Sequence, residues 1–191
     1  MKRGLKVYLF RHGESFFNKD EFFTGWKDSK LTEKGKRDAR KIARILKNKK
    51  IDAAFRTSLS RSKDTLKEVL KFHPECKKII IDDRMIERGY GKLEGRSHEK
   101  IKEEYGEEQF EKWHRGFNER PPGGESFADV EKRVKKFIAK LKNYMRKNNF
   151  NVVVSAHGNS LRLFRKIMER ASIKKSVSWT IPYDRVFEYK I

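Results

Sequence analysis

Apolar residues along the chain fall into short continuous runs separated by longer stretches with helical spacing. Five short runs predict β-strands, at residues 6–10, 51–55, 77–82, 151–156 and 186–191. The last of these follows a polar loop and closes the chain, which is typical of an edge strand. The strand pattern is therefore distributed over the whole length of the sequence.

The intervening stretches predict helices. Apolar residues at helical spacing form one face after Thr32, a plausible N-cap, at Ala39, Ile42, Ala43 and Leu46. Similar faces include Leu66, Val69 and Leu70, and later Leu161, Phe164 and Met168. A helical region is expected over 99–113. After the breaker at 121–124, a long amphipathic helix is expected to start with a capping box of Ser126 and Asp129 and to bury Phe127, Val130, Val134, Phe137, Leu141 and Met145.

Strands that alternate with helices indicate an α/β fold. We expect a three-layer α/β/α arrangement around a mostly parallel central sheet. No internal repeat, low-complexity tract or linker divides the sequence, so residues 1–191 are expected to form a single catalytic domain. In such sheets ligands bind outside the carboxyl ends of the strands, and candidate chemistry is best sought there.

The net positive charge of the sequence is its second notable feature. The sequence has 48 Lys and Arg against 27 Asp and Glu, a formal net charge of +21. This excess predicts attraction to anions such as nucleic acid, acidic membrane surfaces or small phosphorylated metabolites. The lysine-rich stretch 34–50 is interpreted mainly as the solvated face of a helix.

The single cysteine, Cys76, rules out an internal disulfide and suits a reducing compartment. The apolar stretch near the start of the sequence is too short for a signal peptide, and no segment is long enough to span a bilayer. We therefore expect a cytoplasmic protein without a membrane partner.

Chemically capable side chains follow four of the predicted strands. Arg11 and His12 follow the first strand, Arg61 lies beyond the second, Glu87 beyond the third, and His157 directly follows the fourth. Because the carboxyl ends of parallel strands share one edge of the sheet, we expect these five side chains to converge.

This combination suits phosphoryl transfer. A neutral His12 can attack phosphorus and hold the group as phosphohistidine. Arg11 and Arg61 can bind phosphate oxygens, and a protonated His157 can stabilise charge in the transition state. Glu87 can serve as general acid for the leaving alkoxide. The sequence contains no HExxH, CxxC or Walker-type motif, so neither a metal site nor an NTPase is expected.

Several longer segments resemble the histidine phosphatase superfamily and, within it, the cofactor-dependent phosphoglycerate mutases. They are "RHGES" (11–15), "FTGWKDSKLTEKG" (23–35), "ERGYGKLEG" (87–95), "YGEEQFEKWHRGF" (105–117) and "SAHGNSLR" (155–162). The resemblance implies a phosphoglycerate mutase-like fold, with His12 as the phosphorylated nucleophile and Glu87 as proton donor and acceptor. It also implies that Arg11, Arg61 and His157 form the phosphate pocket.

Further roles follow from the same resemblance. It implies that 2,3-bisphosphoglycerate primes the enzyme, which then exchanges phosphate between the 2- and 3-positions of glycerate in glycolysis and gluconeogenesis, without a metal. A homo-oligomer is possible. The resemblance also assigns ten positions to substrate binding. They are Ser15, Asn18, Thr24, Gly25, Tyr90, His98, His114, Arg115, Gly158 and Asn159.

The sequence also departs from the mutase pattern. His98 stands where mutases usually carry a lysine, and His114 replaces the first of two paired arginines. Gly123-Gly124 takes the place of a long insertion, Tyr183-Asp184 replaces Thr-Gly, and the sequence ends at Ile191 without the tail that covers the site in many mutases. A more open pocket would favour hydrolysis of phosphohistidine.

Three functions are therefore compared. A phosphoglycerate mutase is the leading interpretation. A phosphomonoester phosphatase that uses the same His12 intermediate, with water as acceptor, is the alternative. A nucleic-acid-binding protein, prompted by the charge, is the third interpretation. It is disfavoured because the sequence lacks an arginine-rich, glycine-punctuated tract and its arginines point to a compact site.

Overall fold

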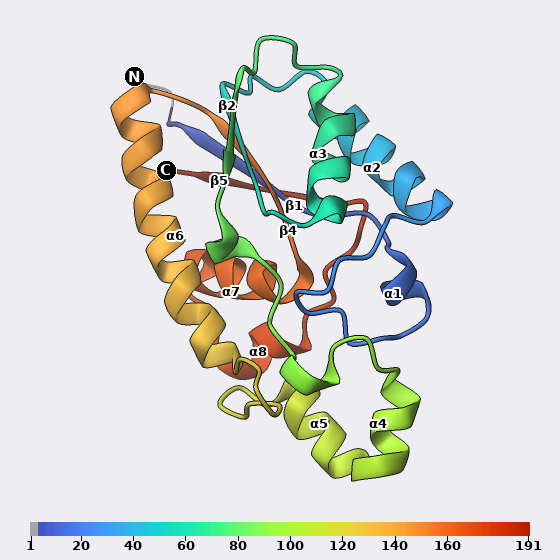
Figure 1. Ribbon diagram of the computed structural model, residues 1–191. Coiled ribbons are helices and arrows are strands. Elements are labelled where there is room, and N and C mark those ends of the chain that lie inside the picture. Colours follow the sequence, from blue (N-terminus) through green and yellow to red (C-terminus); the bar gives the residue numbers. More distant parts are fainter. Residues whose placement is uncertain (1–3) are drawn as a thin grey trace.

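A five-stranded sheet with helices on both faces organises the computed structural model, which describes residues 4–191 (Figure 1). The sheet order is β3-β2-β4-β1-β5. The first four strands run parallel, and β5 is antiparallel to β1 at the edge. Their bounds are β1 Lys6–Arg11, β2 Ala53–Arg56, β3 Lys78–Ile81, β4 Val152–Ala156 and β5 Val186–Lys190. The predicted α/β class with a mostly parallel sheet is confirmed.

Side chains of β1 alternate between two apolar layers. In β1, Val7 and Leu9 join one buried cluster, whereas Tyr8 and Phe10 join another on the opposite face. β1 lies between β4 and β5, with Leu9 opposite Val154. Because both faces of β1 are covered, its apolar residues form a continuous run instead of an alternating pattern.

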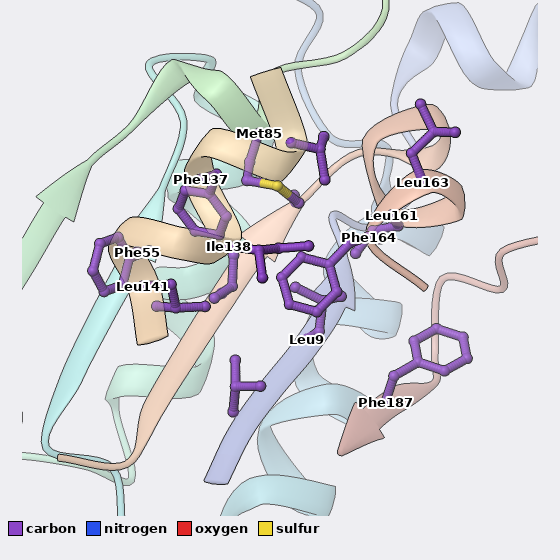
Figure 2. Close-up of a cluster of buried hydrophobic side chains, with 14 of the residues drawn as sticks. Leu9, Phe55, Met85, Phe137, Ile138, Leu141, Leu161, Leu163, Phe164 and Phe187 are labelled. Carbon is purple, nitrogen blue, oxygen red and sulfur yellow. The ribbon is translucent and has the colours of Figure 1, made fainter. Parts of the chain in front are cut away.

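The first face is covered by α6 (Phe127–Asn148) and α7 (Gly158–Glu169). Figure 2 shows Phe137 and Leu141 of α6 and Phe164 of α7 packed over Leu9 and Phe55 of the sheet. The expected capping box at the start of α6 is present, since the Ser126 hydroxyl accepts from the Asp129 amide at 3.1 Å. All six apolar positions predicted for this helix are buried.

The second face is covered by α2 (Glu33–Leu46) and α3 (Ser60–Leu70). Ile42 and Leu46 of α2 are buried with Leu66 and Val69 of α3. The predicted N-cap is confirmed, because the Thr32 hydroxyl accepts from the Gly35 amide at 3.0 Å. Most basic side chains of α2 are exposed, as expected for a solvated face.

Some element boundaries differ from the prediction. The region expected as one helix over 99–113 is two helices, α4 (His98–Tyr105) and α5 (Glu107–Arg115). They are separated by Gly106, whose φ of 80° lies in a region that glycine adopts without strain. The second strand starts at Ala53 instead of residue 51, although Ile51 is buried.

Four short elements were not predicted, because one helical turn produces little periodicity. They are α1 (Phe16–Lys19), α8 (Ile173–Ser178) and two 3₁₀ turns, η1 (Asp83–Met85) and η2 (Gly91–Leu93). Cys76 is buried and unpaired. Between residues 4 and 191, no helix combines the length and apolarity needed to cross a membrane.

The loop after β1 crosses the start of α2 in close backbone contact. A Cβ added at Gly35 would lie 2.0 Å from the Glu14 carbonyl oxygen, and one at Gly13 would lie 2.1 Å from the Gly35 oxygen. Only glycine permits this approach. The crossing fixes the backbone that immediately follows His12.

We predict that Gly35→Ala lowers the free energy of unfolding by about 2 kcal/mol or more, because the backbone must move to admit the methyl group. Urea denaturation measures the change. Gly4→Ala is the matched control, since the nearest atom to its added Cβ lies 3.9 Å away. Equal unfolding midpoints for the two variants would contradict the steric argument.

Candidate active site

His12 lies at the carboxyl end of β1 and is buried, with 1% of its surface exposed. Its backbone amide donates to the Ala156 carbonyl at 3.0 Å, which ties the end of β1 to the end of β4. The ring Nδ1 lies 2.7 Å from the Gly13 carbonyl oxygen. A carbonyl can only accept, so Nδ1 carries the proton and Nε2 has a free lone pair.

Burial lowers the pKa of His12 well below its usual value, and the positive charges of Arg61 and Arg11 lower it further. The ring is therefore neutral at pH 7. A neutral imidazole with a free Nε2 lone pair is the form that can act as a nucleophile.

His157 lies beside His12, at the N-terminus of α7. The two ring centroids are 4.9 Å apart. His157 Nε2 contacts the Thr57 hydroxyl at 2.8 Å, whereas its buried Nδ1 has no protein partner. Burial lowers the pKa of His157 well below its usual value, and Arg61 adds to this effect. These surroundings favour a neutral His157, contrary to the protonated form expected from the sequence. In the tautomer whose Nε2 accepts from the Thr57 hydroxyl, Nδ1 carries the proton and can donate.

Arg61 is fully buried at the start of α3. Its two terminal nitrogens donate to the carbonyls of Gly25 at 2.8 Å and Lys27 at 2.9 Å. Burial lowers its pKa to about 10, which leaves it charged at neutral pH, and nearby Glu87 opposes this decrease. Arg61 therefore anchors the 24–27 loop over the site.

Three buried donors around His12 have no protein partner: Arg11 Nε, Arg61 Nε and His157 Nδ1. They make up three of the five such side-chain atoms within residues 4–191, so the concentration here is distinctive. Buried donors without an acceptor are costly. Two of the three belong to cations, and the arrangement is thus suited to binding an anion against His12.

Glu87 follows β3 and approaches the same point. Its Oε1 accepts from the backbone amides of Arg88 at 2.9 Å and Asn159 at 3.0 Å. A Cβ added at Gly158 would lie 3.6 Å from both Glu87 Oε2 and Arg11 Nε. Gly158 therefore leaves the space between the carboxylate and the guanidinium open.

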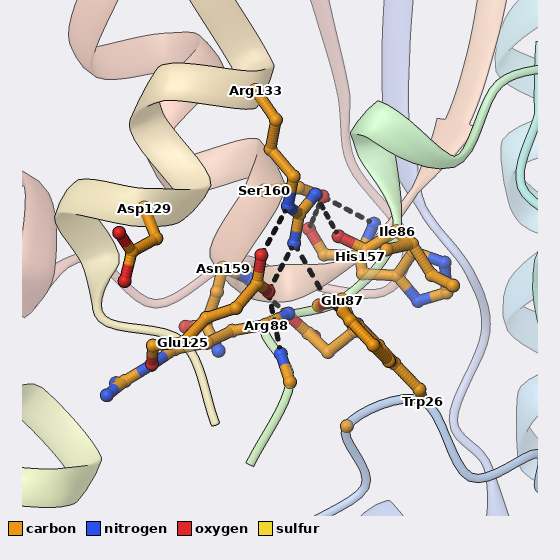
Figure 3. A network of polar contacts seen from close by, with 12 residues as sticks. Trp26, Ile86, Glu87, Arg88, Glu125, Asp129, Arg133, His157, Asn159 and Ser160 are labelled. Atoms are coloured by element: carbon orange, nitrogen blue, oxygen red, sulfur yellow. Dashed lines mark hydrogen bonds and ion pairs between the residues drawn. The ribbon is translucent and has the colours of Figure 1, made fainter. Parts of the chain in front are cut away.

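A polar network holds the backbone of Glu87 in place (Figure 3). The Glu87 carbonyl accepts from Trp26 Nε1 at 2.9 Å and from the Arg133 guanidinium at 3.0 Å. Arg133 also pairs with Glu125 at 2.9 Å, and Glu125 accepts from the Gly89 amide. Sequence reasoning did not identify Trp26, Glu125 or Arg133, because a clamp between distant segments leaves no periodic signal.

A cavity of about 480 Å³ opens beside these residues. Ten of the predicted site residues line it: Arg11, Asn18, Thr24, Glu87, Tyr90, His98, His114, Arg115, Gly158 and Asn159. Two other depressions of similar size lie against α3 but contain none of the predicted site residues.

The other predicted residues lie behind the cavity wall. His12, Arg61 and His157 are almost fully buried at its base. Ser15 is also buried, and its hydroxyl donates to Asn18 Oδ1 at 2.9 Å. The Gly25 carbonyl accepts from Arg61. Ser15 and Gly25 thus correct the expectation of direct substrate contact, since each orients another residue of the site.

The cavity also contains a second cationic pair, Arg115 and Arg162. Arg162, which sequence reasoning did not select although it closes the "SAHGNSLR" segment, lines the cavity with Arg115. Arg162 donates to Asn159 Oδ1 at 2.5 Å and to the Trp179 carbonyl at 2.8 Å. Asn159 in turn donates to the Tyr90 hydroxyl at 3.1 Å. This array fixes the part of the wall that Arg162, Asn159 and Tyr90 form.

His98 and His114 line the same cavity within an aromatic cluster. Their ring centroids are 5.2 Å apart, and both rings contact Phe23 and Phe110. Burial lowers the pKa of His98 and reduces that of His114 to about 3. The two histidines are therefore neutral at pH 7, and they supply shape and hydrogen-bonding capacity instead of charge.

No group of three or more His, Cys, Asp or Glu side chains in residues 4–191 is arranged to hold a metal ion. The buried rings of His12 and His157 lie close to the positive charges of Arg11 and Arg61.

Relatives and solved structures extend these observations. The 2,3-bisphosphoglycerate-dependent phosphoglycerate mutase of Mesorhizobium japonicum is 39% identical over 160 residues, covering 82% of this chain and 77% of that protein. The 2,3-bisphosphoglycerate-dependent phosphoglycerate mutase 2 of Gloeobacter violaceus is 35% identical over 179 residues, covering 93% and 81%.

Among solved structures, YhfR of Bacillus stearothermophilus has a TM-score of 0.86 at 26% identity, covering 96% of this chain and 90% of that chain. A putative alpha-ribazole-5'-P phosphatase from Escherichia coli shares the fold, with a TM-score of 0.83 at 23% identity and coverage of 96% and 89%. The family model for branch 1 of the histidine phosphatase superfamily matches residues 7–188. The chain therefore belongs to the histidine phosphatase superfamily.

Proposed function

We propose that this protein is a phosphoglycerate mutase that interconverts 3-phosphoglycerate and 2-phosphoglycerate through a phosphohistidine at His12. The main support is that one cavity combines the three unpartnered buried nitrogens near His12 with a second cationic pair, Arg115 and Arg162. A substrate with a phosphate at one end and a carboxylate at the other matches this charge pattern. The relatives named as mutases support the same reaction.

The transfer step uses the geometry at the base of the cavity. His12 Nε2 donates its lone pair to phosphorus as the ester P–O bond breaks. Arg11 Nε, Arg61 Nε and His157 Nδ1 hold the phosphoryl oxygens, where negative charge is distributed in the transition state. Glu87 donates a proton to the leaving alkoxide and takes one back from the acceptor hydroxyl in the return step.

The same cavity suits a bisphosphorylated primer, because Arg115 and Arg162 offer a second anionic group a cationic partner. Arg115 and Arg162 would hold that group, and the donors around His12 would hold the phosphate to be transferred. When bound, 2,3-bisphosphoglycerate supplies the phosphoryl group that His12 carries.

The alternative is a phosphomonoester phosphatase that releases the group from His12 to water. The observation that favours it is the tight turn at residues 121–124, closed by the Gly124 amide donating to the Pro121 carbonyl at 2.8 Å. The turn replaces the long insertion of mutases and leaves no additional segment to cover the cavity.

One assay separates the two reactions. The enzyme receives 3-phosphoglycerate and a catalytic amount of 2,3-bisphosphoglycerate, and 2-phosphoglycerate and free phosphate are followed together. A mutase isomerises the substrate with little phosphate release. Phosphate release that equals or exceeds isomerisation would reject the mutase in favour of the phosphatase.

We predict that His12→Ala lowers both mutase and phosphatase turnover by at least about 10³-fold, because no nucleophile remains. Initial rates of isomerisation and phosphate release measure this loss. His73→Gln is the matched control, as His73 is buried but lies outside the cavity. Substantial turnover by a folded His12→Ala protein would exclude the proposed intermediate.

Glu87→Gln is expected to lower kcat by about 10² or more, because the amide cannot donate an acidic proton to the leaving group. The amide oxygen can still accept from the Asn159 amide, so phosphate affinity should stay within a few-fold of wild type. Single-turnover rates and phosphate binding by calorimetry test the two parts. An unchanged kcat would place the proton donor elsewhere.

Stability should depend on pH through the neutral histidines. His12, His157, His98 and His114 have native pKa values below their usual value. Below about pH 6.5 the unfolded chain binds protons that the native state does not, so stability present above that pH is lost as the pH falls. For each histidine the loss approaches at most about 1.4 kcal/mol per pH unit, and only between its unfolded and native pKa values.

Urea denaturation at pH 7.5, 6.5 and 5.5 measures this effect. His114→Phe keeps an aromatic ring in the cluster and should remove one histidine's share of the pH dependence. An unfolding free energy that is constant from pH 7.5 to 5.5 would show that these rings are not held neutral.

A further inference from the structure

The segment that precedes β5 makes two contacts with the guanidinium of Arg11. Arg11 donates to the Ile181 carbonyl at 3.1 Å, and its Cζ lies 4.1 Å from the centroid of the Tyr183 ring. Tyr183 is part of the Tyr-Asp pair that stands where mutases have Thr-Gly. This protein thus places an aromatic ring on a proposed phosphate ligand where that pattern has a small side chain.

The guanidinium carbon of Arg11 lies over the face of the Tyr183 ring. A cation–π contact acts on the cation as a whole and requires no hydrogen bond from any one of its N–H groups. Arg11 Nε is buried and has no protein partner. The ring can therefore restrain Arg11 without competing for the donor that the phosphoryl group needs.

Other charges around the ring are consistent with a neutral phenol. Lys34 Nζ lies 4.9 Å from the ring centroid and also pairs with Asp38 at 3.0 Å and with Glu14 at 3.5 Å. Burial raises the pKa of Tyr183, and Glu14 and Asp38 add to this effect, while Arg11 and Lys34 oppose it. The neutral ring keeps the electron-rich face that attracts both cations.

Tyr183 also forms part of the cavity wall next to the nucleophile. Its ring centroid is 6.4 Å from that of His12, and it lines the cavity together with Thr180 and Ile181. This bulk occupies space through which water could otherwise approach phosphorus. Exclusion of water is what separates transfer from hydrolysis.

We infer that Tyr183 is a positioning residue that holds Arg11 for phosphoryl binding and limits the access of water to phosphohistidine. The inference rests on the proposed function of His12. In hydrolysis, a water oxygen bonds to phosphorus, the P–N bond breaks and returns its electron pair to Nε2, and a water proton passes to Glu87. Tyr183 suppresses this step and leaves the glycerate hydroxyl as the acceptor.

The test compares Tyr183→Ala, Tyr183→Leu and Tyr183→Phe with wild type. Acid-labile phosphoenzyme is formed with labelled 2,3-bisphosphoglycerate, and its lifetime and the ratio of transfer to phosphate release are measured. Tyr183→Ala should shorten the lifetime and lower the ratio severalfold, because water then reaches phosphorus. It should also weaken phosphate binding by about tenfold, the size expected for loss of one desolvated cation–π contact. Tyr183→Phe keeps the ring and should retain the wild-type ratio.

Tyr183→Leu separates the two roles, because it keeps bulk but removes the aromatic face. It should weaken phosphate binding as much as Tyr183→Ala does, with a smaller effect on phosphoenzyme lifetime. It also provides the test if Tyr183→Ala fails to fold. Tyr105→Ala is the matched control, since Tyr105 lies beneath Arg96 outside the cavity.

The outcomes distinguish this inference from the proposed function. If wild type forms no acid-labile phosphoenzyme, the proposed function fails. If wild type forms it and all three Tyr183 variants keep the wild-type lifetime, ratio and phosphate affinity, the role of Tyr183 is overturned while the phosphohistidine chemistry remains. A loss in Tyr183→Phe equal to that in Tyr183→Ala would also overturn it, because the ring would then not be the active feature.

Discussion

The site depends on burying cations beside a neutral imidazole. Arg61 is fully buried, yet its guanidinium keeps one donor free and uses the others to hold the 24–27 loop. Such burial costs stability unless an anion completes the arrangement. The same positive charges lower the pKa of His12. The buried positive charge therefore creates an anion site and also keeps His12 in its neutral, nucleophilic form.

The fold explains how these groups meet. Parallel strands β1, β2 and β4 end at one edge of the sheet, and their following segments deliver His12, Arg61 and His157 to the same point. The clamp of Arg133 and Glu125 then fixes the Glu87 backbone from the α6 side. The same cavity combines Arg115 and Arg162 with two neutral histidines, so the positive charge beside these histidines is concentrated on arginines.

Much of this arrangement could be predicted from the sequence, because strand ends in a parallel sheet converge regardless of loop detail. The convergence of His12, Arg61, Glu87 and His157 needed only the order of elements. The protonation state of His157 could not be predicted, since it depends on the cations buried around the ring. The sequence showed that Tyr183 was unusual, but only the structure brings its ring over Arg11.

In the proposed reaction, Nε2 of a neutral His12 accepts the phosphoryl group while Nδ1 is bound to the Gly13 carbonyl. Phosphorus NMR of the protein after reaction with 2,3-bisphosphoglycerate distinguishes the two ring positions, and peptide mass spectrometry identifies the residue. We predict a single phosphohistidine, at Nε2 of His12. A phosphoryl group on Nδ1, on another residue, or on none would contradict the account.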